Sequence, residues 1–132
     1  MQRMNLALAL QIIQVCETKA TELNKPCVIT VLDNGGNLVA VHRMDGALLC
    51  GIPLSQKKAF TAVSFSGSTD QLASMVQPGA PLYGIQHTGD YIVFGGGVPV
   101  IKDGNLIGAI GVSGGTPAQD KDIANAGVAT IN

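Results

Sequence analysis

Residues 95–122 constrain the fold more than any other part of the sequence. Three glycines at 95–97 lead into two apolar runs that are separated by a turn at 103–104, the pattern of a β-hairpin. The second run ends in glycines, and Thr116 with Gln119 three residues later forms a capping-box signal for a helix. The segment therefore predicts a hairpin that continues through glycines directly into a helix N-terminus.

The glycines of this segment have two interpretations. Backbone N–H groups at a helix N-terminus can bind an anion, whereas glycine also lets a strand and a helix pack closely. The candidate ligand-binding residues in the segment are Gly96, Gly97, Gly114, Gly115 and Thr116.

Composition limits the class of protein. The 132 residues predict one domain over 1–132, with 46% hydrophobic and only 13% charged residues. Such a sparsely charged chain favours a homo-oligomer that hides part of its surface. A net charge of −1 without a basic run argues against a nucleic-acid partner.

The three cysteines, Cys16, Cys27 and Cys50, have neither metal-like spacing nor an even number. Free buried thiols in a reducing compartment are the expectation. No run of 18 apolar residues is present, so we expect no membrane span, and no signal peptide is evident at the N-terminus. These features predict a cytoplasmic protein.

Periodicity predicts an α+β fold with helices packed on an antiparallel sheet. Asn5 is the expected cap of the first helix, Ser68 begins a short capped helix, and Pro53 opens the longer helix before it. The expected elements are helices over 6–23, 53–65, 68–76 and 117–129, and strands over 27–32, 38–43 and 91–94 with the final hairpin.

Two further predictions concern the faces of the last strand and of helix 53–65. The long strand of the final hairpin has no charge on either face, so both faces should be covered, with Ile107 on the face of Ala109. In helix 53–65, Lys57 and Lys58 should flank an inward face, which comprises Ile52, Gln56, Ala59, Phe60 and Val63.

Five motifs together resemble the GlcG/HbpS family, also called the haem-degrading domain family, which includes the C-terminal domain of PduO-type proteins. Each motif is short, but their order covers nearly the whole chain. They are residues 31–38, 43–47, 58–62, 96–99 and 108–116, the last followed by Asp120.

The resemblance implies a profilin-like α+β fold with a five-stranded antiparallel sheet. It also implies oligomers from dimer to octamer, haem binding in some members, and links to corrinoids and to glycerol or diol dehydratase operons in others. PduO-type domains are understood to hold the haem iron through a histidine on the first helix. Residues 6–23 contain no histidine, so this chain departs from that pattern.

Haem iron needs an axial ligand such as histidine, cysteine, methionine or tyrosine. The chain has two histidines, and His87, in a predicted loop, is the candidate iron ligand. His42 lies on a predicted strand, where a structural role is expected. Cys16 lies on the first helix, where a buried thiol is expected rather than a ligand.

Charged residues supply the other site candidates. Arg43 and Asp45 flank a strand exit, where they either bind a carboxylate or propionate or form an ion pair with each other. Lys58 lies in a family motif, where it either faces an anionic ligand or lies on a solvated helix edge.

These observations leave three functions open. The first is a small-molecule binding protein for haem or another tetrapyrrole such as a corrinoid, accessory to dehydratase or cobalamin metabolism. The second is a haem-degrading or other enzyme that uses Arg43, Asp45 and Lys58 on an anionic substrate, although no acid–base set or hydrolase motif is apparent. The third is a structural oligomerisation module.

Overall fold

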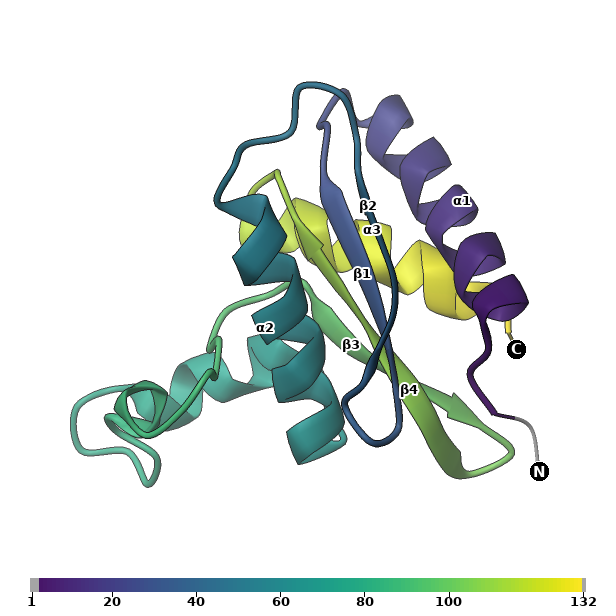
Figure 1. The fold of residues 1–132 in the computed structure, drawn as a ribbon. Helices are drawn as coiled ribbons and strands as arrows, with labels where there is room; N and C mark the ends of the chain where they lie inside the picture. Colours follow the sequence, from purple (N-terminus) through teal and green to yellow (C-terminus); the bar gives the residue numbers. More distant parts are fainter. Residues whose placement is uncertain (1–2, 132) are drawn as a thin grey trace.

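The computed structural model describes residues 3–131, and within that range three α-helices enclose a four-stranded sheet (Figure 1). The strand order is β2-β1-β4-β3, and all neighbouring strands are antiparallel. The elements are α1 (Leu6–Glu22), β1 (Val28–Asp33), β2 (Leu38–Arg43), α2 (Gly51–Phe65), β3 (Gly97–Lys102), β4 (Asn105–Ser113) and α3 (Pro117–Ala129), with 3₁₀ helices η1 (Thr69–Val76) and η2 (Ile85–His87). The predicted α+β class is confirmed. No helix in the described range is long and apolar enough to cross a membrane.

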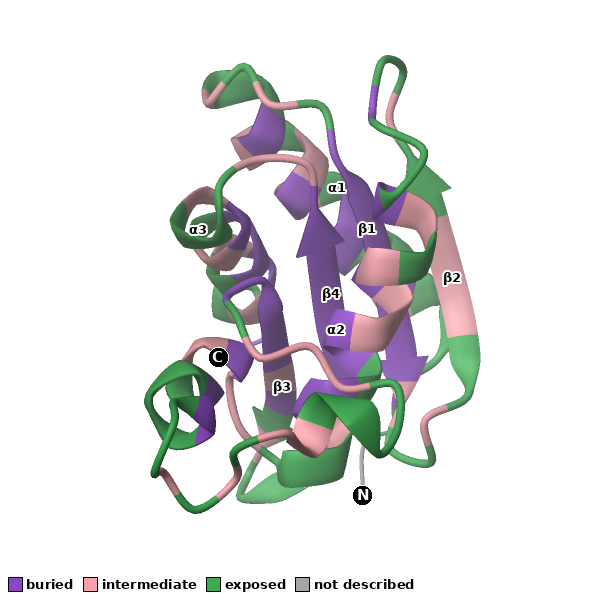
Figure 2. Ribbon diagram, turned by 90° about the vertical axis from the view of Figure 1, so that its left-hand side faces the viewer, coloured by how far each residue is buried: buried purple, intermediate pink, exposed green. Residues whose placement is uncertain are grey.

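The sheet lies between two helical layers, with α2 on one face and α1 with α3 on the other (Figure 1). β1 and β4 are buried in the middle of the sheet, whereas β2 is a partly exposed edge strand (Figure 2). Gly111 on β4 is required by this layering, because a Cβ there would collide with the Ser55 backbone of α2. Both faces of β4 are therefore covered, as predicted.

One face assignment on β4 is wrong. Ile107 packs in the same core cluster as Ile110 and Val112, on the α1–α3 side, instead of sharing the face of Ala109. The register with β3 shifts between Val100 and Ile101, which breaks the regular alternation of faces at this end of the strand.

The five-stranded sheet is not found in residues 3–131, and 91–94 is not a strand. Threonine side chains take the hydrogen bonds that a neighbouring strand would have supplied. The Ile92 N–H donates to Thr61 Oγ1 at 2.9 Å, and Thr69 Oγ1 donates to the Phe94 carbonyl at 2.6 Å. The segment therefore runs across α2 and η1 rather than joining the sheet.

The predicted helix starts hold in part. Asn5 caps α1 through a 2.8 Å bond from the Leu8 N–H, as predicted. α2 begins at Gly51, two residues before the predicted start, because proline is tolerated within the first turn, where its missing N–H has no helical partner. Ser68 makes no side-chain cap, and η1 is a 3₁₀ helix.

The predicted inward face of α2 is largely wrong. Six residues of α2 are buried: Gly51, Ser55, Lys58, Ala59, Thr61 and Ala62. Phe60 is instead 38% exposed and stacks on Tyr91 at a centroid distance of 6.0 Å. Glycines on β3 and β4 bring the helix so close that small residues, together with Lys58, form its inner face.

Candidate functional site

In the part of the chain that the structure describes, predicted site residues line two hollows. The first, here called the Lys58 pocket, has a volume of about 170 Å³ and lies between α2, the end of β4 and the start of α3. Its lining includes Leu48, Cys50, Lys58, Phe94, Gly114 and Asp120. The second lies at the free edge of β2.

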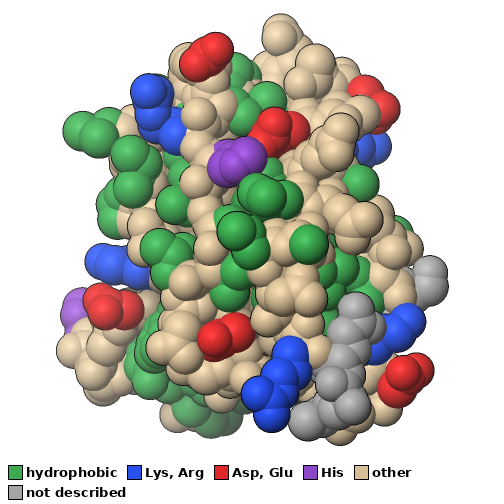
Figure 3. Space-filling view, turned by 45° about the vertical axis from the view of Figure 1, so that its right-hand side comes forward, with side chains coloured by type: hydrophobic (Ala, Val, Ile, Leu, Met, Phe, Trp, Pro, Cys, Tyr) green, Lys and Arg blue, Asp and Glu red, His purple; other side chains and the backbone are tan. Residues whose placement is uncertain are grey.

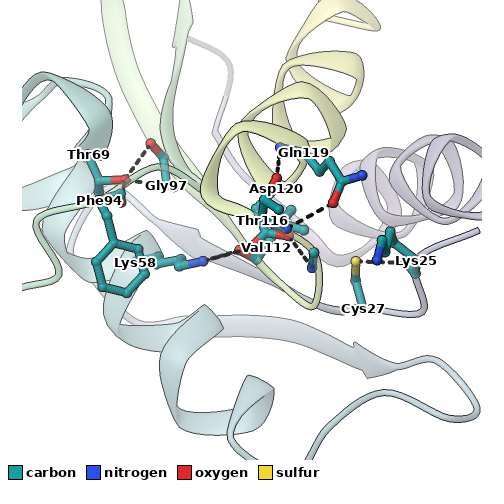
Figure 4. Close-up of polar contacts among 11 residues, drawn as sticks. Lys25, Cys27, Lys58, Thr69, Phe94, Gly97, Val112, Thr116, Gln119 and Asp120 are labelled. Atoms are coloured by element: carbon teal, nitrogen blue, oxygen red, sulfur yellow. Dashed lines mark hydrogen bonds and ion pairs between the residues drawn. The ribbon is translucent and has the colours of Figure 1, made fainter. Parts of the chain in front are cut away.

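Lys58 is fully buried and fully paired (Figure 4). Its Nζ donates to the Val112 carbonyl at 2.8 Å and to Asp120 Oδ2 at 3.0 Å, and it lies 5.2 Å from the centroid of the Phe94 ring. The Lys58 and Asp120 side chains are only 1% and 3% exposed. The charge of Lys58 is therefore balanced inside the protein, and the helix-edge alternative for this residue is wrong.

The helix N-terminus beside this pocket is also satisfied within the chain. Asp120 Oδ1 accepts a 2.7 Å hydrogen bond from the Gly115 N–H. Thr116 and Gln119 form the predicted capping box, in which the Gln119 N–H donates to Thr116 Oγ1 at 3.2 Å and the Thr116 N–H donates to Gln119 Oε1 at 2.9 Å. The carboxylate of Asp120 thus takes the place that an external anion would have, which favours the packing interpretation of these glycines.

Gly96 and Gly97 make room for Lys58. Gly96 has a φ of 132°, and a Cβ there would lie 2.7 Å from Lys58 Nζ. A Cβ at Gly97 would collide with the Lys58 carbonyl. Any larger residue at 96 or 97 would displace the buried lysine, so the glycine run and Lys58 depend on each other.

The thiols near the core are poor ligands. Burial raises the pKa of Cys16 to about 12. Burial, and after it the negative charge of Asp120, raises the pKa of Cys27 to about 11, and its thiol donates to the Lys25 carbonyl at 2.9 Å (Figure 4). Cys50 is exposed and lines the Lys58 pocket. All three cysteines are free, as expected, but the prediction that they are buried is wrong for Cys50.

The second hollow, here called the β2-edge depression, has a volume of about 580 Å³ and lies where β2 leaves the sheet beside α1. A neighbouring hollow of about 460 Å³ along α1 shares Glu17 and Met44 with it. On this side of the molecule, hydrophobic side chains lie in patches among polar ones (Figure 3). The β2-edge depression is lined by Glu17, Val41, His42, Arg43, Met44 and Asp45.

His42 and Glu17 meet in this depression. His42 Nδ1 lies 2.7 Å from Glu17 Oε1, which joins β2 to α1. Sequence reasoning gave His42 a structural role and missed its carboxylate partner. The two residues are 25 positions apart, and only the α1–β2 packing could have revealed the pair.

The predicted site residues fall into separate groups. Arg43 and Asp45 are exposed and line the β2-edge depression, and among residues 3–131 they form no ion pair with each other, so that alternative is wrong. Lys58 lies in the other hollow, so the three residues of the enzyme hypothesis do not share a site. His87 is exposed on η2, in the segment that projects away from the sheet (Figure 1). The described residues contain no cluster of three or more His, Cys, Asp or Glu that could hold a metal ion.

Comparison with known proteins identifies the family. The model of the family described as "Haem degrading protein HbpS-like" matches residues 4–129. The chain belongs to the HbpS-like family. The resemblance expected from the sequence motifs is confirmed.

Three similar proteins show what the family contains. The Citrobacter freundii corrinoid adenosyltransferase PduO is 42% identical over 124 residues, which are 92% of this chain but 37% of PduO. The Klebsiella pneumoniae protein ORFY superposes with a TM-score of 0.96 at 43% identity, over 99% of this chain and 92% of its own. A PduOC:heme complex superposes with a TM-score of 0.95 at 38% identity, over 99% of this chain and 96% of its own. The chain thus spans a little over a third of PduO and nearly all of the other two.

Proposed function

We propose that this protein binds haem, or a related tetrapyrrole such as a corrinoid, in the β2-edge depression. The observation that carries the proposal is this depression of about 580 Å³, in a fold that superposes with a TM-score of 0.95 on a haem complex. Its volume lies within the range of about 300–1,000 Å³ that is usual for ligand pockets. The Lys58 pocket, at about 170 Å³, lies below that range.

The donor set of the depression fits a haem. The Arg43 side chain is exposed and lines the depression, so its guanidinium can pair with a propionate through two parallel hydrogen bonds. Val41 and the stem of Met44 offer apolar surface to a porphyrin face, and His42 offers an imidazole. A bound haem would supply an iron centre and a strong visible absorption band. By the same chemistry, Asp45 at the rim would weaken binding of an anionic ligand.

We further propose that the protein is a cytoplasmic homo-oligomer. Leu48 and Leu49 are 65% and 81% exposed, side by side, and Leu6 at the start of α1 is 57% exposed. Large apolar side chains that gather on a surface mark interaction sites. An accessory role in corrinoid-dependent metabolism is supported by the relationship to PduO, a corrinoid adenosyltransferase.

Titration of the purified protein with haemin, and separately with cobalamin, tests the binding proposal. We expect a saturable shift of the Soret band or of the corrin absorption, with a stoichiometry of one ligand per chain. The absence of a saturable shift with both ligands would overturn the proposal. Light scattering on the same sample gives the oligomeric state, and a monomer at all concentrations would refute the homo-oligomer.

A further inference from the structure

We propose that His42 would hold the iron of a bound haem and that Glu17 on α1 orients its ring. This inference rests on the proposed function and deepens it, because it names the atom that would hold the iron. The observation behind it is the 2.7 Å contact between His42 Nδ1 and Glu17 Oε1 at the β2-edge depression.

The other side chains that could hold iron near the depression are already occupied or buried. The Met44 sulfur accepts a hydrogen bond from the Cys27 N–H at 3.4 Å, which engages one of its lone pairs inside the protein. Cys16 on α1 is buried, and burial raises the pKa of its thiol to about 12. Tyr91 packs against Phe60 on the α2 side of the sheet. Among the described residues that line the depression, His42 is the remaining side chain of the ligand types that haem proteins use.

The geometry of His42 leaves one ring nitrogen available. A carboxylate accepts hydrogen bonds, so Nδ1 is the nitrogen that donates in the Glu17 contact, and Nε2 is the ring nitrogen that can bind a metal ion. Glu17 is the only hydrogen-bond partner of the His42 ring among residues 3–131. The His42 side chain is 49% exposed and lines the depression. Nε2 is therefore the ring nitrogen in this hollow that is free to bind a metal ion.

A histidine held by a carboxylate has the arrangement found around protein-bound metals. The second ring N–H of such a ligand commonly donates to a carboxylate, which fixes the ring and makes the ligating nitrogen more basic. His42 lies opposite Ile29 in the β1–β2 register, on the face that α1 covers, so the backbone fixes both partners. Helix α1 contains no histidine that could bind iron. It contributes instead Glu17, whose carboxylate orients the His42 ring.

The test of the ligand compares His42→Ala with His87→Ala, which removes the other, exposed histidine. We expect resonance Raman spectra of the ferrous haem complex to show an iron–histidine stretch in the wild type and in His87→Ala. The stretch should be lost in His42→Ala, and haem affinity should fall by about tenfold or more. Far-UV circular dichroism checks that both variants are folded.

The test of the positioning role compares Glu17→Gln with Glu22→Gln, which changes another acidic residue of α1 that pairs with Lys19 at 3.9 Å. The amide that Glu17→Gln introduces is a weaker acceptor than a carboxylate, so the ligating nitrogen becomes less basic. We expect the iron–histidine stretch to move to lower frequency in Glu17→Gln, with up to about tenfold weaker haem binding. Glu22→Gln should match the wild type in both measurements.

The outcomes separate this inference from the proposed function. If the wild type binds no haem, both fail. If the wild type binds haem and His42→Ala keeps the iron–histidine stretch, the assignment of His42 is wrong while haem binding stands. If the stretch vanishes in His42→Ala but is unmoved in Glu17→Gln, His42 is the ligand and the positioning role of Glu17 is refuted.

Discussion

The Lys58 pocket and the β2-edge depression each contain a nitrogen base that contacts a carboxylate from a neighbouring helix, yet the two pairs differ in what remains free. Lys58 and Asp120 are almost fully buried, and both carboxylate oxygens and the ammonium have partners inside the protein. His42 and Glu17 are 49% and 35% exposed, and one ring nitrogen of the pair has no partner among residues 3–131. The Lys58–Asp120 pair has all its hydrogen-bond partners inside the protein and therefore stabilises the fold. The His42–Glu17 pair leaves one ring nitrogen in a surface hollow, where it is available to a ligand.

The largest loss of stability is expected when Lys58 is substituted. Lys58→Met removes one partner of a buried ion pair and leaves Asp120 charged and unpaired, which costs about 3–5 kcal/mol of unfolding free energy. Urea unfolding followed by circular dichroism measures this loss. Haem affinity of the folded variant should be unchanged, because Lys58 does not line the β2-edge depression. A folded Lys58→Met protein with wild-type stability and lost haem binding would reverse the roles of the two sites.

Two further variants control the Lys58 result. Lys57→Met changes the adjacent lysine, which is half exposed and 3.8 Å from Asp90, and should cost about 0–1 kcal/mol. Lys58→Met combined with Asp120→Asn removes both charges while the amide oxygen can still accept from the Gly115 N–H. The double variant should therefore recover part of the lost stability. If it is no more stable than Lys58→Met, the cost comes from lost packing rather than from an unpaired charge.

The next prediction concerns the reactivity of the three thiols in the folded protein. A pKa raised to about 12 at Cys16 leaves its thiolate fraction about a thousandfold below that of an ordinary cysteine at pH 8. Cys50 is exposed, so one thiol should react with a disulfide reagent in the native state, while Cys16 and Cys27 should react only after unfolding. Timed thiol titration of the wild type and Cys50→Ser measures this. A second fast thiol in the native protein would contradict the buried state of Cys16 and Cys27.

A smaller effect is expected at the rim of the β2-edge depression. Arg43→Ala should weaken haem binding by about tenfold, since it removes one charge-assisted propionate contact. Asp45→Ala should strengthen binding slightly by removing a negative charge from the rim. Both residues are exposed, so their unfolding free energies should change by less than about 0.5 kcal/mol. Equal haem affinities for Arg43→Ala and Asp45→Ala would show that propionates bind elsewhere.

The sequence predicted the parts of the fold that depend on local chemistry. The Thr116–Gln119 capping box, the Asn5 cap and the two hairpins have signals within a few residues, and all are present. The inner face of α2 could not be read in the same way, because its periodicity is set by glycines on β3 and β4 that approach the helix from distant parts of the chain.

The candidate site was hidden for the same reason. Lys58 looks like half of a solvated Lys-Lys pair until its partner, 62 residues away, is placed beside it. His42 looks like a strand residue until α1 brings Glu17 to its ring. The family motifs include Lys58 and the glycines beside its pocket. Of the residues that line the β2-edge depression, only those in the 43–47 motif belong to a family motif. The predicted strand over 91–94 does not form, because threonine side chains make the hydrogen bonds to its backbone.

The smallest effect tests how the β2 edge is held in register. Asp33 Oδ1 accepts 2.9 Å hydrogen bonds from the Gly35 and Asn37 N–H groups in the β1–β2 turn. Burial acts to raise the pKa of Asp33, but the hydrogen bonds from Asn37 and Gly35 outweigh it and hold the pKa below its usual value. Because the folded-state pKa is the lower one, this contribution is complete above the unfolded pKa of about 3.9 and is lost as the pH falls through the folded pKa.

Asp33→Asn should therefore flatten the acid side of the stability curve below about pH 4, at a cost of less than about 1 kcal/mol at pH 7. Urea unfolding from pH 7 to pH 2 measures the difference. The matched control is Asp103→Asn in the β3–β4 turn, where the backbone carbonyl of Asp103, not its carboxylate, accepts from Asn105. If Asp103→Asn flattens the curve as much as Asp33→Asn, the pH dependence does not come from the turn that positions β2. A selective effect at Asp33 would tie the acid stability of the protein to the strand that carries His42.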